Sequence, residues 1–304
     1  MCTYGSRTFT SYVPVLGSKV FNEEEIFRML RLLMNENDNC LYLLPTANRI
    51  KCWSSEEKQY LWELSGLYEG DIMLDEQNKG WKNGLVGTAS RWPAAIVYLL
   101  ISMFAIADDD DVELIEGAIK EYHKNTCIRF RPYQKTDNDY VTIEGKMSGC
   151  WSLVGRHDRG QVVNLQNPGC MKHGVIVHEF MHALGFYHQQ STADRDEWVT
   201  INWENIKAGK EHNFNKYGNR TVTDYGVGYD YTSVMHYSSH AFSKNGEPTI
   251  SPKVSKETVK LGQRKGLSGK DILKLQEMYK EECHRILETR PSDIVEKSRD
   301  ALQC

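Results

Sequence analysis

The hydrophobic and polar positions of this chain follow helical spacing in some segments and strand spacing in others, which predicts a mixed α and β fold. Residues 175–184 are apolar on nearly every side apart from two histidines and one glutamate, a pattern typical of a buried central helix. The other predicted elements are strands at residues 94–107, 140–144 and 161–165, and helices at residues 21–34, 112–122 and 268–280. The last helix begins with Ser268 and Asp271, which outline a capping box. We expect the region between residue 188 and this helix to be irregular.

The most informative stretch is HEFMHALGFYH, from His178 to His188. His178 and His182 are four residues apart, so on a helix they lie one turn apart on the same face. Both can bind one metal ion, and Glu179 beside them is placed to act on water. Gly185 can adopt the left-handed conformation that ends a helix, and this turn can bring His188 round as a third ligand. Three ligands leave a fourth position for water, which is typical of a catalytic zinc site.

The short His-Glu-x-x-His pattern has an alternative interpretation, because two histidines at this spacing also occur as a hydrogen-bonded pair in a core. The glycine and the third histidine disfavour this alternative. Together they form the extended metzincin signature, in which a methionine-containing turn follows further along the chain. Met235, in the segment SVMHY, supplies that methionine. A purely structural metal site is a weaker alternative, because such a site does not need Glu179.

The residues that follow the third histidine resemble those of the astacin family of zinc endopeptidases. The matching segments are Gly-Phe-Tyr-His at residues 185–188, Asp-Arg-Asp at 194–196 and Tyr-Thr-Ser-Val-Met-His-Tyr at 231–237. Further matches lie at residues 126–130, 149–152 and 279–283, so the resemblance extends from about residue 83 to residue 283. It implies a pro-segment at residues 1–82, a catalytic domain at 83–283 and a short polar tail at 284–304.

The resemblance also implies the fold and the roles of the site residues. The implied fold is a two-subdomain metzincin fold of the α+β class, with a twisted mixed sheet, a central zinc-binding helix and an irregular C-terminal subdomain. The implied ligands of one Zn²⁺ ion are His178, His182 and His188. Glu179 would act as the general base, and the Tyr237 hydroxyl would stabilise the oxyanion. Met235 would pack beneath the metal without binding it.

A second motif precedes the catalytic part. Residues 68–71, Tyr-Glu-Gly-Asp, are similar to the Phe-x-Gly-Asp element of astacin pro-segments, in which the aspartate (here Asp71) occupies the open position on zinc and keeps the enzyme latent. A carboxylate is a good zinc ligand and blocks formation of the nucleophile. The alternative interpretation is an ordinary Gly-Asp turn. The mature chain would begin near Asn83, where Lys82 suits an activating protease of trypsin-like specificity.

The sequence has eight cysteines, which suggest an oxidising compartment. The family resemblance implies one disulfide between Cys127 and Cys283 and another between Cys150 and Cys170. The cysteines that spacing does not assign are Cys2, Cys40, Cys52 and Cys304. Asn219 begins a glycosylation sequon, which is meaningful in a secreted protein.

We expect a secreted protein, although residues 1–21 contain no apolar segment of the kind found in a signal peptide. The simplest reconciliation is an incomplete or wrongly assigned N-terminus, and a cytosolic protein is the alternative. The longest apolar run, residues 94–107, is too short to span a bilayer. The net charge of −4 gives no reason to expect nucleic acid or an anionic membrane as a partner. Residues 108–111 are aspartates, which predict a solvated turn before a helix, with a calcium site as the alternative.

The expected substrate is a protein or peptide. Cys150, Trp151 and Ser152 resemble the family's strand at the edge of the active-site cleft, which would pair with an extended peptide backbone. Two positions depart from the family: Gln189 stands where a glutamate holds the new N-terminus after activation, and Thr192 stands where arginine is common. These departures motivate a competing hypothesis, a catalytically silent zinc-binding or interaction protein on the same fold. The complete set of ligands and base favours the enzyme.

Overall fold

The computed structural model describes residues 65–74, 88–102, 109–167, 169–218, 222–254 and 259–288, together with two short strands near the N-terminus. The chain divides into two compact units, residues 1–44 and 45–304. In the first unit, β1 (Val15–Leu16) pairs antiparallel with β2 (Lys19–Val20). The helix predicted at residues 21–34 lies outside the described residues, as do Lys82, Asn83, Asn219 and the four unassigned cysteines. Within the described ranges, no helix is long and apolar enough to cross a membrane.

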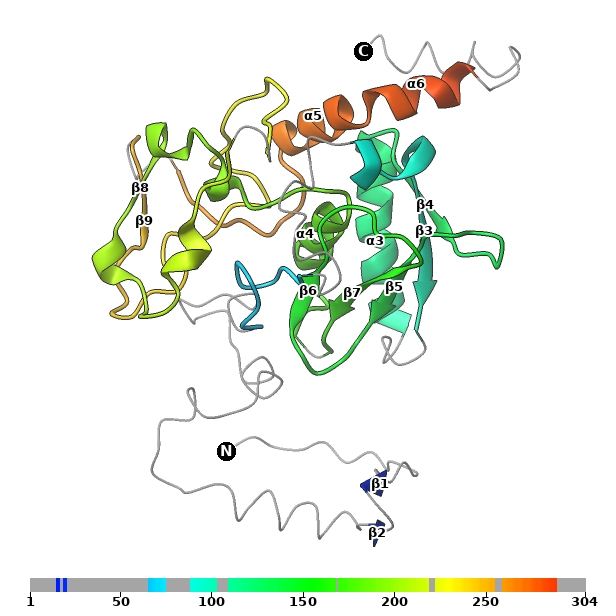
Figure 1. Cartoon of the computed structure of the whole chain (residues 1–304), viewed down its shortest axis with the longest axis horizontal. Coiled ribbons are helices and arrows are strands. Elements are labelled where there is room, and N and C mark those ends of the chain that lie inside the picture. The colour runs from blue at the N-terminus through cyan, green and yellow to red at the C-terminus, as the bar shows by residue number, and fades with distance from the viewer. Residues whose placement is uncertain are drawn as a thin grey trace. The chain divides into compact units, whose positions relative to one another are not determined.

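The second unit contains a five-stranded mixed sheet with the strand order β4-β3-β5-β7-β6 (Figure 1). Its strands are β3 (Ile96–Ile101), β4 (Arg129–Pro132), β5 (Val141–Glu144), β6 (Cys150–Ser152) and β7 (Gln161–Leu165). Strand β3 pairs in parallel with β4 and β5, and β5 pairs in parallel with β7. Strand β6 runs antiparallel to β7 at one edge, which makes the sheet mixed as predicted.

Strand β3 begins at Ile96, later than the predicted start at residue 94. Pro93–Ala95 forms a short 3₁₀ turn instead, in which both alanines lie in the left-handed region at φ 53°. This turn follows Trp92, a fully buried residue whose indole nitrogen donates to the carbonyl of Ala183 at 2.9 Å. The buried Trp92 and the turn after it therefore delay the start of the strand to Ile96.

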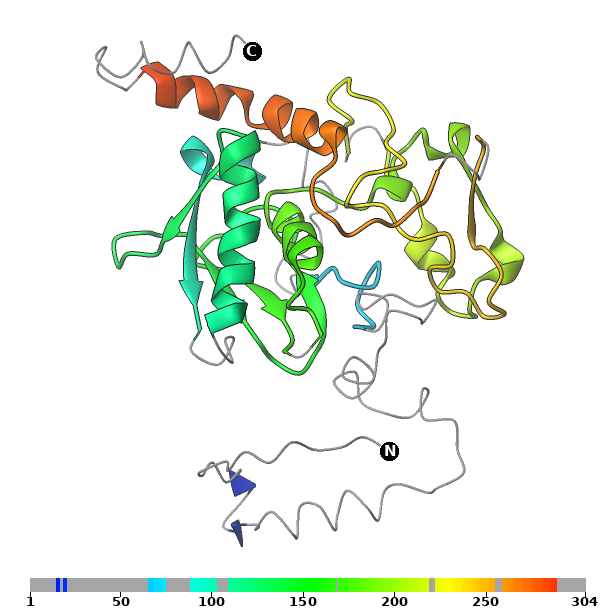
Figure 2. The same cartoon turned by 180° about the vertical axis from the view of Figure 1, so that it is seen from behind.

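Helices α3 (Asp109–Asn125) and α4 (His173–Ala183) pack against each other and against the sheet (Figure 2). Asp109, Asp110 and Asp111, predicted as part of a solvated turn, instead form the first turn of α3, where negative charge is favourable. Helix α4 is buried from Gly174 onward, as its apolar pattern predicts. Gly174 allows close approach to Arg264, because a Cβ atom at Gly174 would lie 1.8 Å from the Arg264 carbonyl oxygen. The first part of the histidine motif is thus held on a helix in the centre of the core.

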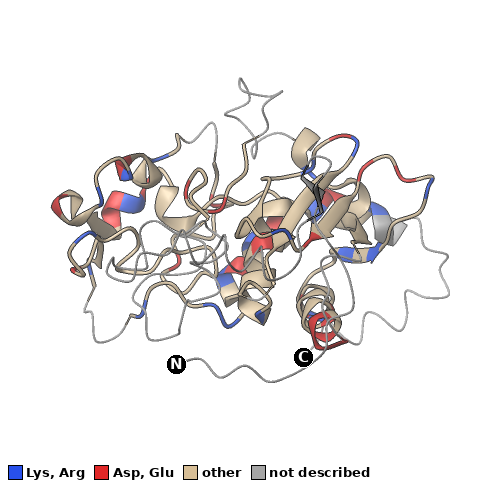
Figure 3. Cartoon of the chain, turned by 90° about the horizontal axis from the view of Figure 1, so that it is seen from below, with Lys and Arg blue, Asp and Glu red and all other residues tan. Residues whose placement is uncertain are grey.

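The chain after His188 is mostly irregular, as predicted, and builds a second hydrophobic cluster that includes Phe214 and Ile250. Its short strands β8 (Val199–Ile201) and β9 (Ile250–Pro252) pair antiparallel and were not predicted. Acidic and basic positions are interspersed along the described ribbon rather than separated by sign (Figure 3).

Two consecutive helices close the described part of the chain. Helix α5 (Gly269–Met278) starts with the predicted capping box, in which Ser268 and Asp271 exchange side-chain and backbone hydrogen bonds. Helix α6 (Lys280–Glu288) follows directly and extends past the predicted helix end at residue 280 (Figure 1). Disulfides join Cys127 to Cys283 and Cys150 to Cys170, the two pairs that the family resemblance implies. The first of these ties α6 to the segment between α3 and β4.

Candidate metal centre

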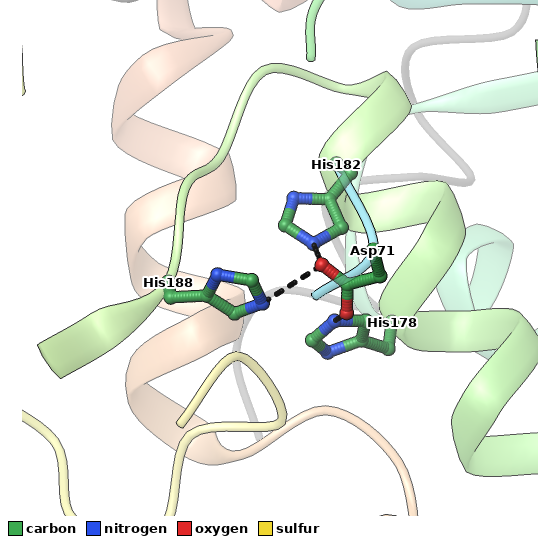
Figure 4. Close-up of side chains that lie close together, drawn as sticks. All are labelled: Asp71, His178, His182 and His188. Atoms are coloured by element: carbon green, nitrogen blue, oxygen red, sulfur yellow. Dashed lines mark hydrogen bonds and ion pairs between the residues drawn. The ribbon is translucent and has the colours of Figure 1, made fainter. Parts of the chain in front are cut away.

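The three histidines of the motif meet in space, together with Asp71. Helix α4 presents His178 and His182 on one face, and the chain turns at Gly185, with φ 114°, before it returns His188 to them. Candidate ligand atoms of the four residues all lie within 4.8 Å of one another, and all four residues are buried. Figure 4 shows the Asp71 carboxylate between the three rings. A hydrogen-bonded pair of histidines in a core would not need a third histidine and a buried aspartate beside it, so this arrangement disfavours that alternative.

Each histidine is oriented through its Nδ1 atom, which faces an oxygen. The Nδ1 partners are the Val234 carbonyl for His178 at 2.8 Å, the Phe186 carbonyl for His182 at 2.7 Å and the Glu69 carboxylate for His188 at 2.7 Å. A neutral imidazole that faces a carbonyl or carboxylate oxygen carries its single proton on that nitrogen, which leaves the lone pair of Nε2 for a metal ion. Such outer hydrogen bonds are typical of metal-binding histidines because they fix the ring and its tautomer.

The Asp71 carboxylate lies where the three Nε2 atoms converge (Figure 4). The distances are 3.1 Å from Oδ2 to His178 Nε2, 3.4 Å from Oδ1 to His182 Nε2 and 3.2 Å from Oδ1 to His188 Nε2. Burial opposes ionisation of this carboxyl, but the three neighbouring imidazoles, His188 foremost, hold its pKa well below the usual range. Asp71 is therefore an anionic oxygen donor at the centre of three imidazoles.

The side-chain atoms at this centre are suited to binding zinc. Among the described residues, Asp71 Oδ1, His182 Nε2 and His188 Nε2 are buried and have no hydrogen-bond partner. Buried polar atoms without partners are rare in folded proteins, and a cation at their common centre satisfies them. Three imidazole nitrogens and one carboxylate oxygen are ligands that zinc prefers in a four-coordinate site. The residues present thus fit one zinc ion.

Glu179 lies beside the first histidine of the cluster and is fully buried. In the part of the chain that the structure describes, neither of its carboxylate oxygens has a hydrogen-bond partner. Burial and the nearby charge of Asp71 raise the pKa of the Glu179 carboxyl well above its usual value. A carboxylate that is disfavoured in its charged form accepts a proton readily, which is the property that a general base needs.

Tyr237 and Met235 contact the loop of the third histidine. The Tyr237 ring lies 4.7 Å from the His188 ring between centroids, and its hydroxyl donates to the Glu69 carbonyl at 2.6 Å. Met235 is buried in the main core, and its carbonyl accepts from the backbone N–H of Gln189 at 3.0 Å. The methionine turn thus supports the loop of the third histidine.

Glu69 is a site residue that the sequence reasoning missed. It is fully buried, and its backbone lies in the left-handed region at φ 46°, which is uncommon for a residue other than glycine. Its carboxylate accepts from Tyr217 Oη at 2.7 Å and from Ser191 Oγ at 3.2 Å, in addition to His188. Its backbone N–H donates to Asn213 Oδ1 at 3.0 Å. The available signal was its place inside the Tyr-Glu-Gly-Asp motif.

The segment that carries Asp71 also covers the sheet edge expected to receive substrate. Ile72 forms a parallel bridge with Ser152 on β6. The Ser152 N–H donates to the Asp71 carbonyl at 3.0 Å, and the Met73 N–H donates to the Ser152 carbonyl at 2.9 Å. Ser65 adds side-chain hydrogen bonds to the backbone of Cys150. The backbone groups of this edge are therefore already paired within the chain.

Comparison with known proteins identifies the family. Residues 85–280 match the peptidase family described as Astacin, and the chain belongs to this family. Zinc metalloproteinase nas-13 of Caenorhabditis elegans is 45% identical over 199 residues, which cover 65% of this chain and 43% of that protein. Meprin A subunit beta of Rattus norvegicus is 41% identical over 218 residues, which cover 70% of this chain and 29% of that protein.

A solved structure is similar as well. High choriolytic enzyme 1, a hatching enzyme zinc-protease from Oryzias latipes, has a TM-score of 0.57 and 34% identity, and the match covers 69% of this chain and 98% of that one. These findings confirm the predicted family and its metzincin fold, and the first relative named above is itself called a zinc metalloproteinase. The chain spans less than half the length of nas-13 and of the meprin subunit. The roles of single site residues stay predictions.

Proposed function

We propose that this chain is a zinc endopeptidase that hydrolyses peptide bonds of protein substrates. The observation that carries the proposal is the convergence of three buried Nε2 atoms next to a buried carboxyl, Glu179, that has no hydrogen-bond partner among the described residues. When bound, zinc supplies Lewis acidity that lowers the pKa of a water ligand to about 7 and polarises a carbonyl group.

The chain's own residues supply the proton transfers and the charge stabilisation. Glu179 takes a proton from the attacking water and passes it to the leaving amine. Tyr237, once its hydroxyl leaves the Glu69 carbonyl, donates to the oxyanion of the tetrahedral intermediate. The edge of β6 at Ser152 pairs with the backbone of an extended substrate, which gives affinity with little dependence on sequence.

We further propose that the chain is made as a latent zymogen. Three contacts of residues 65–74 support this: Asp71 lies among the zinc ligands, Glu69 holds the Tyr237 hydroxyl, and Ile72 pairs with the β6 edge. Cleavage near Lys82 and Asn83 by a protease of trypsin-like specificity would release all three. Two disulfides in the folded chain support secretion into an oxidising compartment.

The test uses the full chain before and after trypsin treatment. We expect the treated chain to cleave an unfolded protein such as casein, and an excess of a zinc chelator to stop the cleavage. The Glu179→Gln variant should fold and bind zinc but lose about 10²–10⁴-fold in rate, because it lacks the base. Full activity in Glu179→Gln, or in excess chelator, would contradict the mechanism.

A catalytically silent zinc-binding protein is the second candidate, and the neutral Gln189 next to the third histidine favours it. This candidate predicts one bound zinc and no turnover after complete removal of residues 1–82. Mass spectrometry of the trypsin-treated chain shows whether removal is complete. A fully processed chain that binds zinc but has no activity would support this candidate over the enzyme.

A further inference from the structure

We propose that Asp271 and Lys274, one turn apart on α5, are positioning residues that hold two of the three zinc-binding histidines from behind. This inference rests on the proposed zinc site, and it concerns residues that touch neither the ion nor the substrate. Both side chains are buried, although they belong to a helix whose opposite face is exposed. Buried ionisable residues need hydrogen-bonding partners, and these partners connect α5 to the metal centre.

Asp271 connects α5 to the methionine turn. Its Oδ2 accepts from the backbone N–H of Val234 at 2.8 Å, and its Oδ1 accepts from Ser233 Oγ at 2.6 Å. Ser233 Oγ in turn accepts from the backbone N–H of Met235 at 3.0 Å. The carbonyl of Val234 is the oxygen that faces His178 Nδ1 at 2.8 Å. Hydrogen bonds therefore connect Asp271 on α5, through the backbone of Val234, to His178.

Lys274 connects α5 to the loop of the third histidine. Its Nζ donates to Gln189 Oε1 at 2.5 Å, and Gln189 directly follows His188. The backbone N–H of Gln189 donates to the Met235 carbonyl, so the two connections meet at the methionine turn. Burial lowers the pKa of Lys274, whereas the surrounding carboxylates, Asp271 foremost, oppose this shift.

Packing alone does not fix this region. A cavity of about 30 Å³, which is room for roughly one water molecule, lies between α5 and the loop of the third histidine. Its walls include His188, Gln189, Met235, Asp271 and Lys274. Because this space adjoins Gln189, hydrogen bonds as well as packing contacts hold its side chain. The Lys274 bond is charge-assisted and buried, which makes it a strong and directional constraint.

The second histidine supplies an internal comparison. His182 Nδ1 faces the carbonyl of Phe186, just past the end of its own helix, and this contact includes no residue of α5. Loss of the α5 contacts should therefore loosen His178 and His188 while His182 keeps its orientation. Changes in the residues that orient metal-binding histidines typically cost about 10–100-fold in metal affinity.

The test compares two lysine-to-methionine variants of the full chain. Lys274→Met keeps the length of the side chain and removes the donor to Gln189. Lys270→Met is the matched control, because Lys270 lies on the same helix and donates to the Tyr229 carbonyl at 2.7 Å, which is not the Nδ1 partner of any zinc-binding histidine. The readouts are the zinc dissociation constant in competition with a chelator and the absorption spectrum of the Co²⁺-substituted protein.

We expect Lys274→Met to weaken zinc binding about 10–100-fold and to change the Co²⁺ spectrum, whereas Lys270→Met changes neither. Gln189→Met should give the same loss, and the double variant should lose no more than either single variant, because both changes break one contact. Wild-type affinity and spectrum in Lys274→Met and Gln189→Met would overturn the inference. Absence of zinc binding by the wild-type chain would overturn both the inference and the proposed function.

Discussion

The three histidines differ in what orients them. His182 relies on the end of its own helix and His178 on the methionine turn, whereas His188 relies on the Glu69 carboxylate. Glu69 belongs to the segment that the proposed activation removes. Under the proposed activation, the third histidine would therefore lose its Nδ1 partner, while the other two would keep theirs.

Tyr237 is the residue whose substitution tests the proposed stabilisation of the oxyanion. Tyr237→Phe should lower the kcat of the trypsin-treated enzyme about 10²–10³-fold, because one donor to the developing charge is lost. The KM should change little, because the donor acts mainly in the transition state. Tyr231→Phe is the control, since the Tyr231 hydroxyl donates to the Trp198 carbonyl instead. Equal kcat values for Tyr237→Phe and the wild type would contradict this role.

Asp71 is the residue whose substitution tests latency. In Asp71→Asn an amide replaces the carboxylate among the three histidines, and a neutral amide is a weaker zinc ligand than a carboxylate. We expect the unprocessed variant to cleave a fluorogenic peptide before trypsin is added, whereas the unprocessed wild type stays inactive. After trypsin both should show the same rate. An unprocessed variant as inactive as the wild type would place latency in the other contacts of the segment.

The residues that form the metal site could be predicted from the sequence, whereas the residues that support them could not. The histidine spacing, the base and the Met-His-Tyr segment lie within short motifs, so local reasoning could find them. Glu69 and Lys274 could not be found in this way, because their contacts join residues 119 and 85 positions apart in the chain. Such contacts depend on the tertiary arrangement of loops, which hydrophobic periodicity does not encode.

Helix α4 is the element on which the site depends, and its entry into the core requires a residue without a side chain. Gly174→Ala would place a Cβ atom 1.8 Å from the Arg264 carbonyl oxygen, so the backbone must move. We expect a loss of about 2–3 kcal/mol in the free energy of unfolding. Gly269→Ala is the control, because a Cβ atom at Gly269 meets nothing within 4 Å. Equal unfolding midpoints for the two variants in a denaturant titration would contradict this packing.

The long periodic elements could be predicted, whereas the short ones could not. Helix α4 and strands β5 and β7 carry clear apolar patterns over their length. Strands β8 and β9 have three residues each, too few for a period to be recognised. Helix α6 was missed because it is largely polar and is held through Cys283 and Tyr279, whose hydroxyl donates to the Leu184 carbonyl at 2.8 Å.

At the scale of the whole molecule, the two disulfides close loops of very different length. The Cys127–Cys283 bond spans 156 residues and the Cys150–Cys170 bond spans 20. The chain-entropy model predicts losses of about 5 and about 3 kcal/mol on their removal, because a longer loop restricts the unfolded chain more. Thermal unfolding of Cys127→Ala/Cys283→Ala and of Cys150→Ala/Cys170→Ala measures the difference. A smaller loss for the first pair would show that native contacts, not chain entropy, set the order.

The central claim is that three histidines and Asp71 share one zinc ion in the unprocessed chain. Anomalous diffraction at the zinc edge, from crystals of the full chain, tests it most directly. We expect one peak at about 2.0–2.2 Å from the three Nε2 atoms and from an Asp71 oxygen. Absence of a peak, or a peak that Asp71 or any of the three histidines does not contact, would show that these four residues do not share one zinc ion.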